Sequence, residues 1–310
     1  MQRWRGVEQA PSGWGRSLVT IGVFDGVHRG HQAIIGRAVE HARELGIPSV
    51  VVTFDPHPSE VVRPGTHPAM LTSQQHKADL IEALGVDVLC VIPFTQEFSR
   101  LDPQAFVVET LVEHLHASSV LVGENFRFGH DAAGDVSTLR QLGSRFGFEV
   151  AVADLISEAG TTFSSTFIRS RIASGDVVTA AAALGRPHRL DGVIVRGDAR
   201  GRAIGFPTAN LETHRYAAIP ADGVYAGWLL RRDERLAAAI HVGTNATFAG
   251  TDRRVEAFVL DFDGDIYGEH VSLEMIERLR GSERFPDVDS LVVQMHADVA
   301  RTREVLGLIR

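Results

Sequence analysis

The sequence predicts an α/β protein in two parts, with a parallel sheet in residues 1–185 and a small antiparallel β-barrel in residues 186–310. Two observations predict this division. From Leu18 to about Val152, apolar runs bounded by turn residues alternate with segments of helical periodicity, and such alternation forms a parallel sheet with helices on both faces. After the Ala-rich stretch that ends at Gly185, short apolar runs follow one another between Gly-rich turns, a spacing typical of a small barrel.

In the first part, a helix is predicted over residues 31–45, because Ile34, Ile35, Ala38, Val39, Ala42 and Leu45 fall on one helical face. Gly46 then supplies a C-terminal stop. Ligands of such a parallel sheet bind outside the carboxyl ends of the strands. The predicted strands are residues 18–24, 49–54, 86–92, 119–123 and 148–153.

The second part is predicted to end in a helix that starts near Asp287 and packs on the barrel. Leu291, Val292, Met295, Val299 and Val305 recur there near helical spacing. The predicted strands of the barrel start at Gly192, Gly223, Leu236, Val255 and His270.

Composition narrows the function classes. The net charge of -8 argues against a non-specific nucleic-acid binder, and no apolar run approaches the roughly 18 residues that would span a bilayer. Cys90 is the only cysteine, so intrachain disulfides and cysteine-cluster zinc sites are excluded, and its apolar context predicts a buried strand residue. The N-terminus lacks the apolar core of a signal peptide, so we expect a cytoplasmic protein with no membrane or nucleic-acid partner.

The stretch GVFDGVHRGH, residues 22–31, joins the first predicted strand to the first predicted helix. Gly26 and Gly30 permit close approach of a ligand to the backbone, and amides at a helix start bind anions. His28 and His31, three residues apart, can face one phosphate chain. Two other interpretations are open: a Gly-rich turn that only reverses the chain, and a histidine pair that binds a metal.

This stretch resembles the signature of the nucleotidyltransferase superfamily, with its HxGH core, and the resemblance implies a Rossmann-like domain. It implies that His28 and His31 are catalytic residues that contact ATP phosphates and stabilise the departing pyrophosphate. Gly22, Phe24 and Asp25 belong to the same implied phosphate site. No Walker A sequence is present, so a P-loop kinase is not expected.

Two later segments, GENFRFG and SSTFIRSRI, fit the same resemblance. It implies that Asn125 helps to place the nucleotide or flavin, and that Ser165, Thr166 and Arg169 hold phosphates. From the residues alone, Ser and Thr are also ordinary helix caps, and a single Arg is more often a solvated surface charge.

The segment TFDPHP resembles the FMN adenylyltransferase branch of that superfamily. Its aromatic and proline surface could receive an isoalloxazine ring. The candidate flavin contacts are Phe54, Pro56, Phe126 and Phe128, although Phe at a strand end is more often part of a core.

In the second part, VRGDARGRAIGFPTANL combines a Gly-rich approach with PTAN. Amides near Gly201 and Gly205 can wrap phosphates, and Thr208 and Asn210, two positions apart on an extended segment, can offer oxygens to one Mg²⁺. PTAN alone would be a Pro-initiated turn. GFPTAN resembles the riboflavin kinase signature, which implies that Thr208 and Asn210 organise Mg²⁺ and ATP.

Glu256 is the candidate base of a kinase that acts on an alcohol. As part of a strand it shares a face with Phe258, Leu260 and Phe262, which predicts apolar surroundings, but the strand could also turn Glu256 to solvent. In the resemblance to riboflavin kinases it falls at the catalytic position.

The motifs follow one another in the order of the bifunctional prokaryotic riboflavin kinase and FAD synthetase family. That resemblance implies ATP-dependent phosphorylation of riboflavin to FMN, then adenylyl transfer to FMN giving FAD. The expected partners are riboflavin, FMN, FAD and ATP, with Mg²⁺ as cofactor and weak self-association. The sequence departs from the family pattern at Ala246, where Pro is common, and at Asn125, where many relatives carry Asp. Two rivals are another acceptor for the nucleotidyl group and a flavin-binding protein without turnover.

Overall fold

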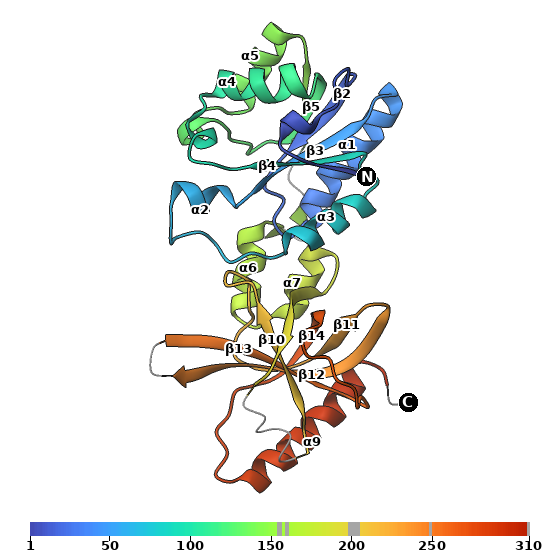
Figure 1. Ribbon diagram of the computed structural model, residues 1–310, viewed down its shortest axis with the longest axis vertical. Coiled ribbons are helices and arrows are strands. Elements are labelled where there is room, and N and C mark those ends of the chain that lie inside the picture. Colours follow the sequence, from blue (N-terminus) through green and yellow to red (C-terminus); the bar gives the residue numbers. More distant parts are fainter. Residues whose placement is uncertain (154–156, 159–160, 198–204, 248–249, 309–310) are drawn as a thin grey trace. The chain divides into compact units, whose positions relative to one another are not determined.

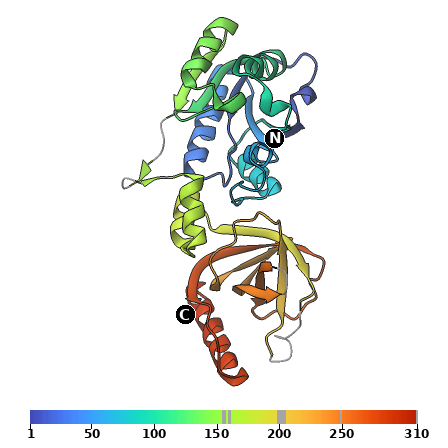
Figure 2. The same ribbon diagram turned by 90° about the vertical axis from the view of Figure 1, so that its left-hand side faces the viewer.

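The computed structural model divides the chain into two compact units, each described here by itself (Figures 1 and 2). It describes residues 1–153, 157–158, 161–197, 205–247 and 250–308. The first unit comprises Met1–Pro68 and Gln74–Phe163, and the second comprises Ala69–Ser73 and Ser164–Arg310. The long segment of the second unit therefore begins at Ser164, whereas the domain boundary at 185 stays a prediction from the sequence.

The first unit contains a six-stranded parallel sheet in the order β1-β4-β3-β2-β5-β6. This is the fold class predicted for the first part of the sequence. The strands are β1 (Gln2–Arg5), β2 (Ser17–Ile21), β3 (Ser49–Asp55), β4 (Val88–Pro93), β5 (Ala117–Gly123) and β6 (Glu149–Ala153). The main helices are α1 (Arg29–Leu45), α3 (Gln74–Ala83), the π-helix η3 (Val107–His114) and α5 (Val136–Phe146). The shorter elements are η1 (Val7–Gln9), α2 (Pro58–Val62), η2 (Phe98–Arg100), α4 (Pro103–Phe106), η4 (His130–Ala132), β7 (Ser157–Glu158) and β8 (Thr161–Thr162).

Both faces of this sheet are covered, as the continuous apolar strands require. In β3, Val50 and Val52 pack into a core with η3 and α5, while Val51 packs into a second core with α1 and α3. Cys90 is fully buried in β4, as predicted. Helix α1 ends at Gly46, whose φ of 66° is the left-handed conformation that glycine adopts without strain.

The strand order places a switch point next to β2. The chain passes from β2 to β3 on one side, and β5 later pairs with β2 on the other side. Helices leave in opposite directions at such a point, so a crevice opens outside the carboxyl ends of the two strands. Both the Gly22–His31 segment after β2 and the Gly123–Phe128 segment after β5 start at this edge.

The second unit is a closed barrel in the order β10-β13-β12-β11-β14-β9, antiparallel throughout (Figure 1). Its strands are β9 (His188–Val195), β10 (Thr208–Thr213), β11 (Gly223–Arg231), β12 (Glu234–Thr247), β13 (Gly250–Val259) and β14 (His270–Gly281). Its helices are α6 (Ser165–Ala173), α7 (Val177–Leu184) and α9 (Val288–Val305). Helix α9 starts near Asp287, as predicted, and the side chain of Asp287 caps it.

Alternate residues of β10, β12 and β13 face the interior of the barrel. Leu211, Val255, Ala257, Ile240 and Val242 belong to its buried core. The residues between them therefore face outward, toward the side on which α9 contacts β11, β12 and β14. The outward residues can contact a ligand without disturbing the core.

Helix α9 is held on the barrel by a bidentate ion pair. Arg280 of β14 donates from Nε to Oδ1 of Asp298 at 2.9 Å and from Nη2 to Oδ2 at 2.7 Å. Asp298 is only 7% exposed, and Gln294 donates a further hydrogen bond to its Oδ1 at 2.9 Å. Removing one partner of such a buried ion pair costs about 3–5 kcal/mol, because the other charge is left buried without compensation.

Replacing Asp298 by Ala should loosen α9, because Arg280 then loses its partner. We expect a loss of about 3 kcal/mol in local stability, which corresponds to amide exchange in Val288–Val305 on the order of 100-fold faster. Hydrogen-exchange mass spectrometry measures this directly. The matched control is Arg301→Ala on the same helix, whose ion pairs are exposed and should change the exchange by less than about 1 kcal/mol. Equal protection in the two variants would contradict the assignment.

Candidate functional sites

The turn after β2 holds an unusual backbone. Phe24, Gly26 and Val27 have φ of 49°, 84° and 37°. A non-glycine residue in the left-handed region costs on the order of 1–3 kcal/mol and persists only where neighbouring groups fix it. Such strain gathers at ligand sites, and here it directs the chain sharply from β2 into α1.

His28 and His31 lie together at the start of α1, as their spacing predicts. His28 is the N-cap, and its Nδ1 accepts a hydrogen bond from the backbone N–H of His31 at 3.4 Å. The two rings stack with centroids 3.6 Å apart, and Phe24 meets His31 edge-on at 5.2 Å. A Cβ at Gly30 would lie 3.0 Å from the His28 ring, so the small residue between the histidines permits the stack.

The predicted phosphate residues of this motif are therefore brought to one place. Phe24, Asp25 and His28 are buried, and His31 is half-buried. The ring of Phe24 covers Gly22, where a Cβ would come within 2.9 Å of the ring. The first backbone N–H groups of α1, which carry the partial positive charge of the helix N-terminus, lie beside the two histidines. Together with the imidazole rings they can bind an anion.

Ser165, Thr166 and Arg169 lie on α6, in the second unit. The cap of α6 is Ser164, whose Oγ accepts from the N–H of Phe167 at 3.2 Å, so Ser165 and Thr166 are the first two helical residues. Arg169 donates from Nε to the carbonyl of Ala69 at 2.7 Å. Their contact with the nucleotide of the first unit stays a prediction.

The candidate flavin phenylalanines of the first unit are connected in one aromatic cluster. Phe126 stacks on Phe128 at 5.4 Å, Phe128 contacts Phe106 at 5.7 Å, and Phe98 links Phe106 to Phe54. Phe106 and Phe128 are buried, while Phe54, Phe98 and Phe126 are half-buried. The structure thus gives Phe128 a core position and leaves partly accessible ring surface at the carboxyl ends of β3 and β5.

Asn125 and Pro56 border the same edge of the sheet. Asn125 is exposed just after β5, and a Cβ at Gly123 would lie 3.3 Å from its Oδ1 and 3.6 Å from Ile34 of α1. Pro56 is half-buried directly after β3. Both positions are compatible with a ligand at the switch point.

In the barrel, Thr208, Asn210 and Glu256 come together on the outer face. Asn210 is directly opposite Glu256 in the β10–β13 pair, and Thr208 Oγ1 donates to Glu256 Oε2 at 3.4 Å. The side-chain amide of Asn210 lies where a Cβ of Gly197 would be, so the Gly-rich approach contacts the PTAN segment. Gly205 has a φ of 87°, and the predicted phosphate residue Gly201 lies outside the described residues.

The predicted apolar face around Glu256 is partly wrong. Strand β13 ends at Val259, so Leu260 and Phe262 lie beyond it and do not continue the face of Glu256. Phe258 does share that face, because it is two residues from Glu256 within the strand. Glu256 is half-buried, between the solvent-facing and the apolar interpretation of the sequence.

Glu256 borders a pocket of about 400 Å³ between the outer face of the barrel and α9. Most of its wall is apolar, and Arg280 and Asp298 lie at one side. Phe206 closes part of it through edge contacts with Phe258 at 5.1 Å and His296 at 5.0 Å. The apolar wall is formed by Phe206, Val224, Ala239, Phe258, Phe285, Leu291, Met295 and Val299.

Residue His241 is a functional candidate that the sequence did not reveal. It is directly opposite Glu256 in the β12–β13 pair and lines the same pocket. Although part of the side chain is accessible to solvent, the ring lies in a concave site where surrounding protein atoms displace water. This desolvation lowers the pKa of His241 below 6.5, and the negative charge of Glu256 opposes the shift. Only the strand register, which the sequence does not specify, brings the two residues together.

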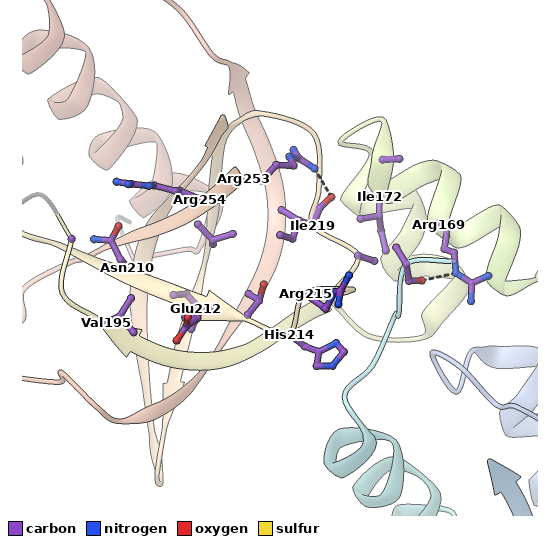
Figure 3. Close-up of a pocket in the computed structure, with 18 of the residues that line it drawn as sticks. Arg169, Ile172, Val195, Asn210, Glu212, His214, Arg215, Ile219, Arg253 and Arg254 are labelled. Carbon is purple, nitrogen blue, oxygen red and sulfur yellow. Dashed lines mark hydrogen bonds between the residues drawn. The ribbon is translucent and has the colours of Figure 1, made fainter. Parts of the chain in front are cut away.

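A second cavity, of about 740 Å³, is arginine-rich (Figure 3). Figure 3 shows Asn210 and Arg254 on the barrel side of it and Arg169 and Ile172 on α6. Its guanidinium groups can bind phosphate oxygens in a forked geometry. They belong to Arg169, Arg196, Arg215, Arg253 and Arg254. The row Asn210–Glu256 therefore separates an apolar pocket from a basic cavity.

Comparisons with known proteins fit two successive modules. A family model described as FAD synthetase matches residues 11–167, and one described as riboflavin kinase matches residues 184–306. The bifunctional riboflavin kinase/FMN adenylyltransferase of Escherichia coli strain K12 is 36% identical over 294 residues, 94% of each chain.

The chain belongs to the bifunctional riboflavin kinase/FMN adenylyltransferase family.

The protein of the same name from Listeria monocytogenes is 37% identical over 92% of this chain and 91% of its own. A crystal structure from Streptococcus pneumoniae, titled a macrolide-efflux protein, superposes on 97% of this chain and 98% of its own with a TM-score of 0.87 and 33% identity. The family resemblance and the fold class are confirmed. In the described ranges, no helix has the length and apolar character needed to cross a membrane.

Exchange of Glu256 for Gln should lower the pKa of His241 further, because the carboxylate charge that opposes desolvation is removed. Titration of the histidine Cε1 protons by NMR measures this, and the signal missing in His241→Asn identifies the residue. Because the unfolded chain binds this proton more readily than the folded one, stability from this site is lost as pH falls through 6.5 toward the folded pKa. A midpoint at or above 6.5 in the wild type would contradict the described environment.

Proposed function

We propose that the second unit transfers the γ-phosphoryl group of ATP to the 5′-hydroxyl of riboflavin, giving FMN, and that the first unit transfers AMP from ATP to FMN, giving FAD and pyrophosphate. One observation carries the kinase assignment. Glu256 and Asn210 lie side by side between an apolar pocket and an arginine-rich cavity. A flavin ring requires the first environment and a triphosphate requires the second. The bifunctional names of the relatives support both reactions.

In the kinase reaction, the pocket beside α9 takes the isoalloxazine ring and directs the ribityl chain toward Glu256. The carboxylate of Glu256 accepts the hydroxyl proton as the oxygen bonds to the γ-phosphorus, and ADP leaves. Arg196 and Arg254 are placed to offset the charge of the phosphates from the basic cavity. Positioning and charge stabilisation supply most of the rate in such reactions.

Thr208 and Asn210 fit a magnesium ion. Both offer neutral oxygen donors from one face of β10, and Mg²⁺ prefers few protein ligands alongside substrate phosphates. Among the described residues, no group of three His, Cys, Asp or Glu side chains could hold a metal. Bound there, Mg²⁺ would neutralise charge on the transferred phosphoryl group.

In adenylyl transfer, a phosphate oxygen of FMN attacks the α-phosphorus of ATP and pyrophosphate leaves. His28, His31 and the first amides of α1 offset the charge that develops on the leaving group. Gly22, Phe24 and Asp25 shape the turn, while Ser165, Thr166 and Arg169 stay predicted phosphate contacts. The half-buried rings of Phe54 and Phe126 are proposed to receive the isoalloxazine of FMN.

A cytoplasmic location is proposed from the cysteine. Cys90 is fully buried, and burial raises the pKa of its thiol to about 12, so it is inert as a thiolate. A chain without disulfides suits a reducing compartment. Weak self-association stays a prediction.

Glu256→Gln should lower the rate of FMN formation from riboflavin by about 10²–10⁴, because Gln cannot accept the proton. FAD formation from supplied FMN should stay within about twofold of wild type, since that reaction uses other groups. Flavins separated by chromatography after incubation with ATP and MgCl₂ report both rates. Glu274→Gln, a carboxylate on β14 in an ion pair with Arg235, is the matched control and should leave both rates unchanged. Loss of both activities in Glu256→Gln would count against separate sites.

Replacing His28 and His31 together by Ala should reverse this pattern. We expect FAD formation to fall by at least about 10³, because the charge on pyrophosphate loses its partners, while FMN accumulates at the wild-type rate. The same chromatographic assay, started from riboflavin, measures the accumulation. His114→Ala, which changes a half-buried histidine of η3, is the control. A double variant that still makes FAD at a tenth of the wild-type rate would contradict the assignment.

A further inference from the structure

Lys77 is the only lysine of the chain, and it is buried. It lies on α3 with 1% of its surface exposed, although lysine is among the residues that are almost never fully buried unless they are paired. Burial lowers the pKa of its ammonium group, and the charges of Asp25 and Asp55 oppose that shift. A buried cation costs stability, so its retention requires a local reason.

The atom that Lys77 contacts belongs to the strained turn. Its Nζ donates to the carbonyl oxygen of Val23 at 3.2 Å, and Thr53 Oγ1 of β3 donates to the same oxygen at 3.0 Å. Val23 directly precedes Phe24, the first residue with positive φ. At the other end of the turn, Gln32 Nε2 donates to the carbonyl of Val27 at 2.8 Å. Side chains therefore fix the carbonyls that flank the left-handed residues.

The turn transmits this anchoring to the histidines. Phe24 is placed by the backbone of Val23, and its ring covers Gly22. The rings of Phe24 and His31 form an edge-on contact, with centroids 5.2 Å apart and an interplanar angle of 88°. His31 in turn stacks on His28. A shift of the Val23 carbonyl would move Phe24 and tilt the imidazole of His31.

We propose that Lys77 is a positioning residue for adenylyl transfer, whose ammonium group fixes the Val23 carbonyl and through Phe24 the orientation of His31. This inference rests on the proposed function of the first unit. Lys77 contacts neither ATP nor FMN in this account and is not the phosphate-binding lysine of a P-loop. Its charge is balanced by Asp25 from the turn and Asp55 from the end of β3.

Lys77→Met tests the inference, because Met keeps the length and apolar stem of lysine and removes the donor. We expect kcat for FAD formation from FMN and ATP to fall on the order of 100-fold, the effect of a small misplacement of a catalytic group. KM for FMN and for ATP should change less than about threefold, since the binding surfaces persist. Lys77→Arg keeps a cation with donors and should recover at least about tenfold of the loss.

Thr53→Val provides a second variant that leaves no charge unpaired. It removes the other donor on the Val23 carbonyl, so it should lower the same kcat more modestly, and the Lys77→Met/Thr53→Val pair should be non-additive because both act on one atom. The exposed Gln75→Met on α3 is the matched control and should behave as wild type. FMN formation, measured in every variant, reports on the other unit and should not change.

The outcomes separate two kinds of failure. A kcat for FAD formation within about twofold of wild type in Lys77→Met, or a loss confined to KM, would overturn the positioning role. Additive effects of the Lys77 and Thr53 changes would overturn the shared-carbonyl account. Wild-type protein that makes FMN but no FAD would instead overturn the proposed function of the first unit, before any variant is compared.

Discussion

The strand register of the barrel is the constraint on which the kinase-like site depends. Asn210, Glu256 and His241 share one row only because β10, β13 and β12 pair at these positions. Since side chains alternate with a period of two, a shift of one residue would turn this polar row into the barrel and its apolar neighbours outward. Closure of the barrel leaves no free edge along which the strands could slip. The core thus fixes the chemistry on its outer surface.

The sequence predicted most strands of the sheet and the barrel, together with α1 and α9, because their apolar periodicity is strong. Buried runs such as Ser49–Asp55 and the amphipathic α1 carry their structure in local pattern. It did not predict β1 or β10. The first, Gln2–Arg5, is a polar edge strand with one buried residue, and the second, Thr208–Thr213, has only Leu211 fully buried. Both are extended because neighbouring strands offer hydrogen bonds, which is a tertiary effect.

The two candidate sites differ in how much of them lies in contiguous sequence. Ten residues contain the whole His28–His31 arrangement, because an anion site at a helix start is built from local backbone. The barrel site joins side chains from five strands and α9, so the sequence identified Thr208, Asn210 and Glu256 by motif but not His241 or Arg280. The buried position of Lys77 was equally hidden, because it depends on how α3 packs against the sheet.

The short segment Ala69–Ser73 has a consequence for dividing this protein. Although it lies early in the chain, it belongs to the second unit: Met70 exchanges backbone hydrogen bonds with Tyr216 and Ala218, and Ser73 donates to Asp191 at 2.5 Å. The polypeptide therefore passes between the units three times, at 68/69, 73/74 and 163/164. A fragment that starts at Ser164 would lack the Ser73 hydroxyl, which donates a hydrogen bond to the half-buried carboxylate of Asp191. It would also lack Met70, whose backbone hydrogen bonds hold the loop before β11. The riboflavin kinase family model matches one continuous stretch of the chain, but the compact unit that contains the barrel also includes Ala69–Ser73. A single truncation point therefore does not yield the whole unit.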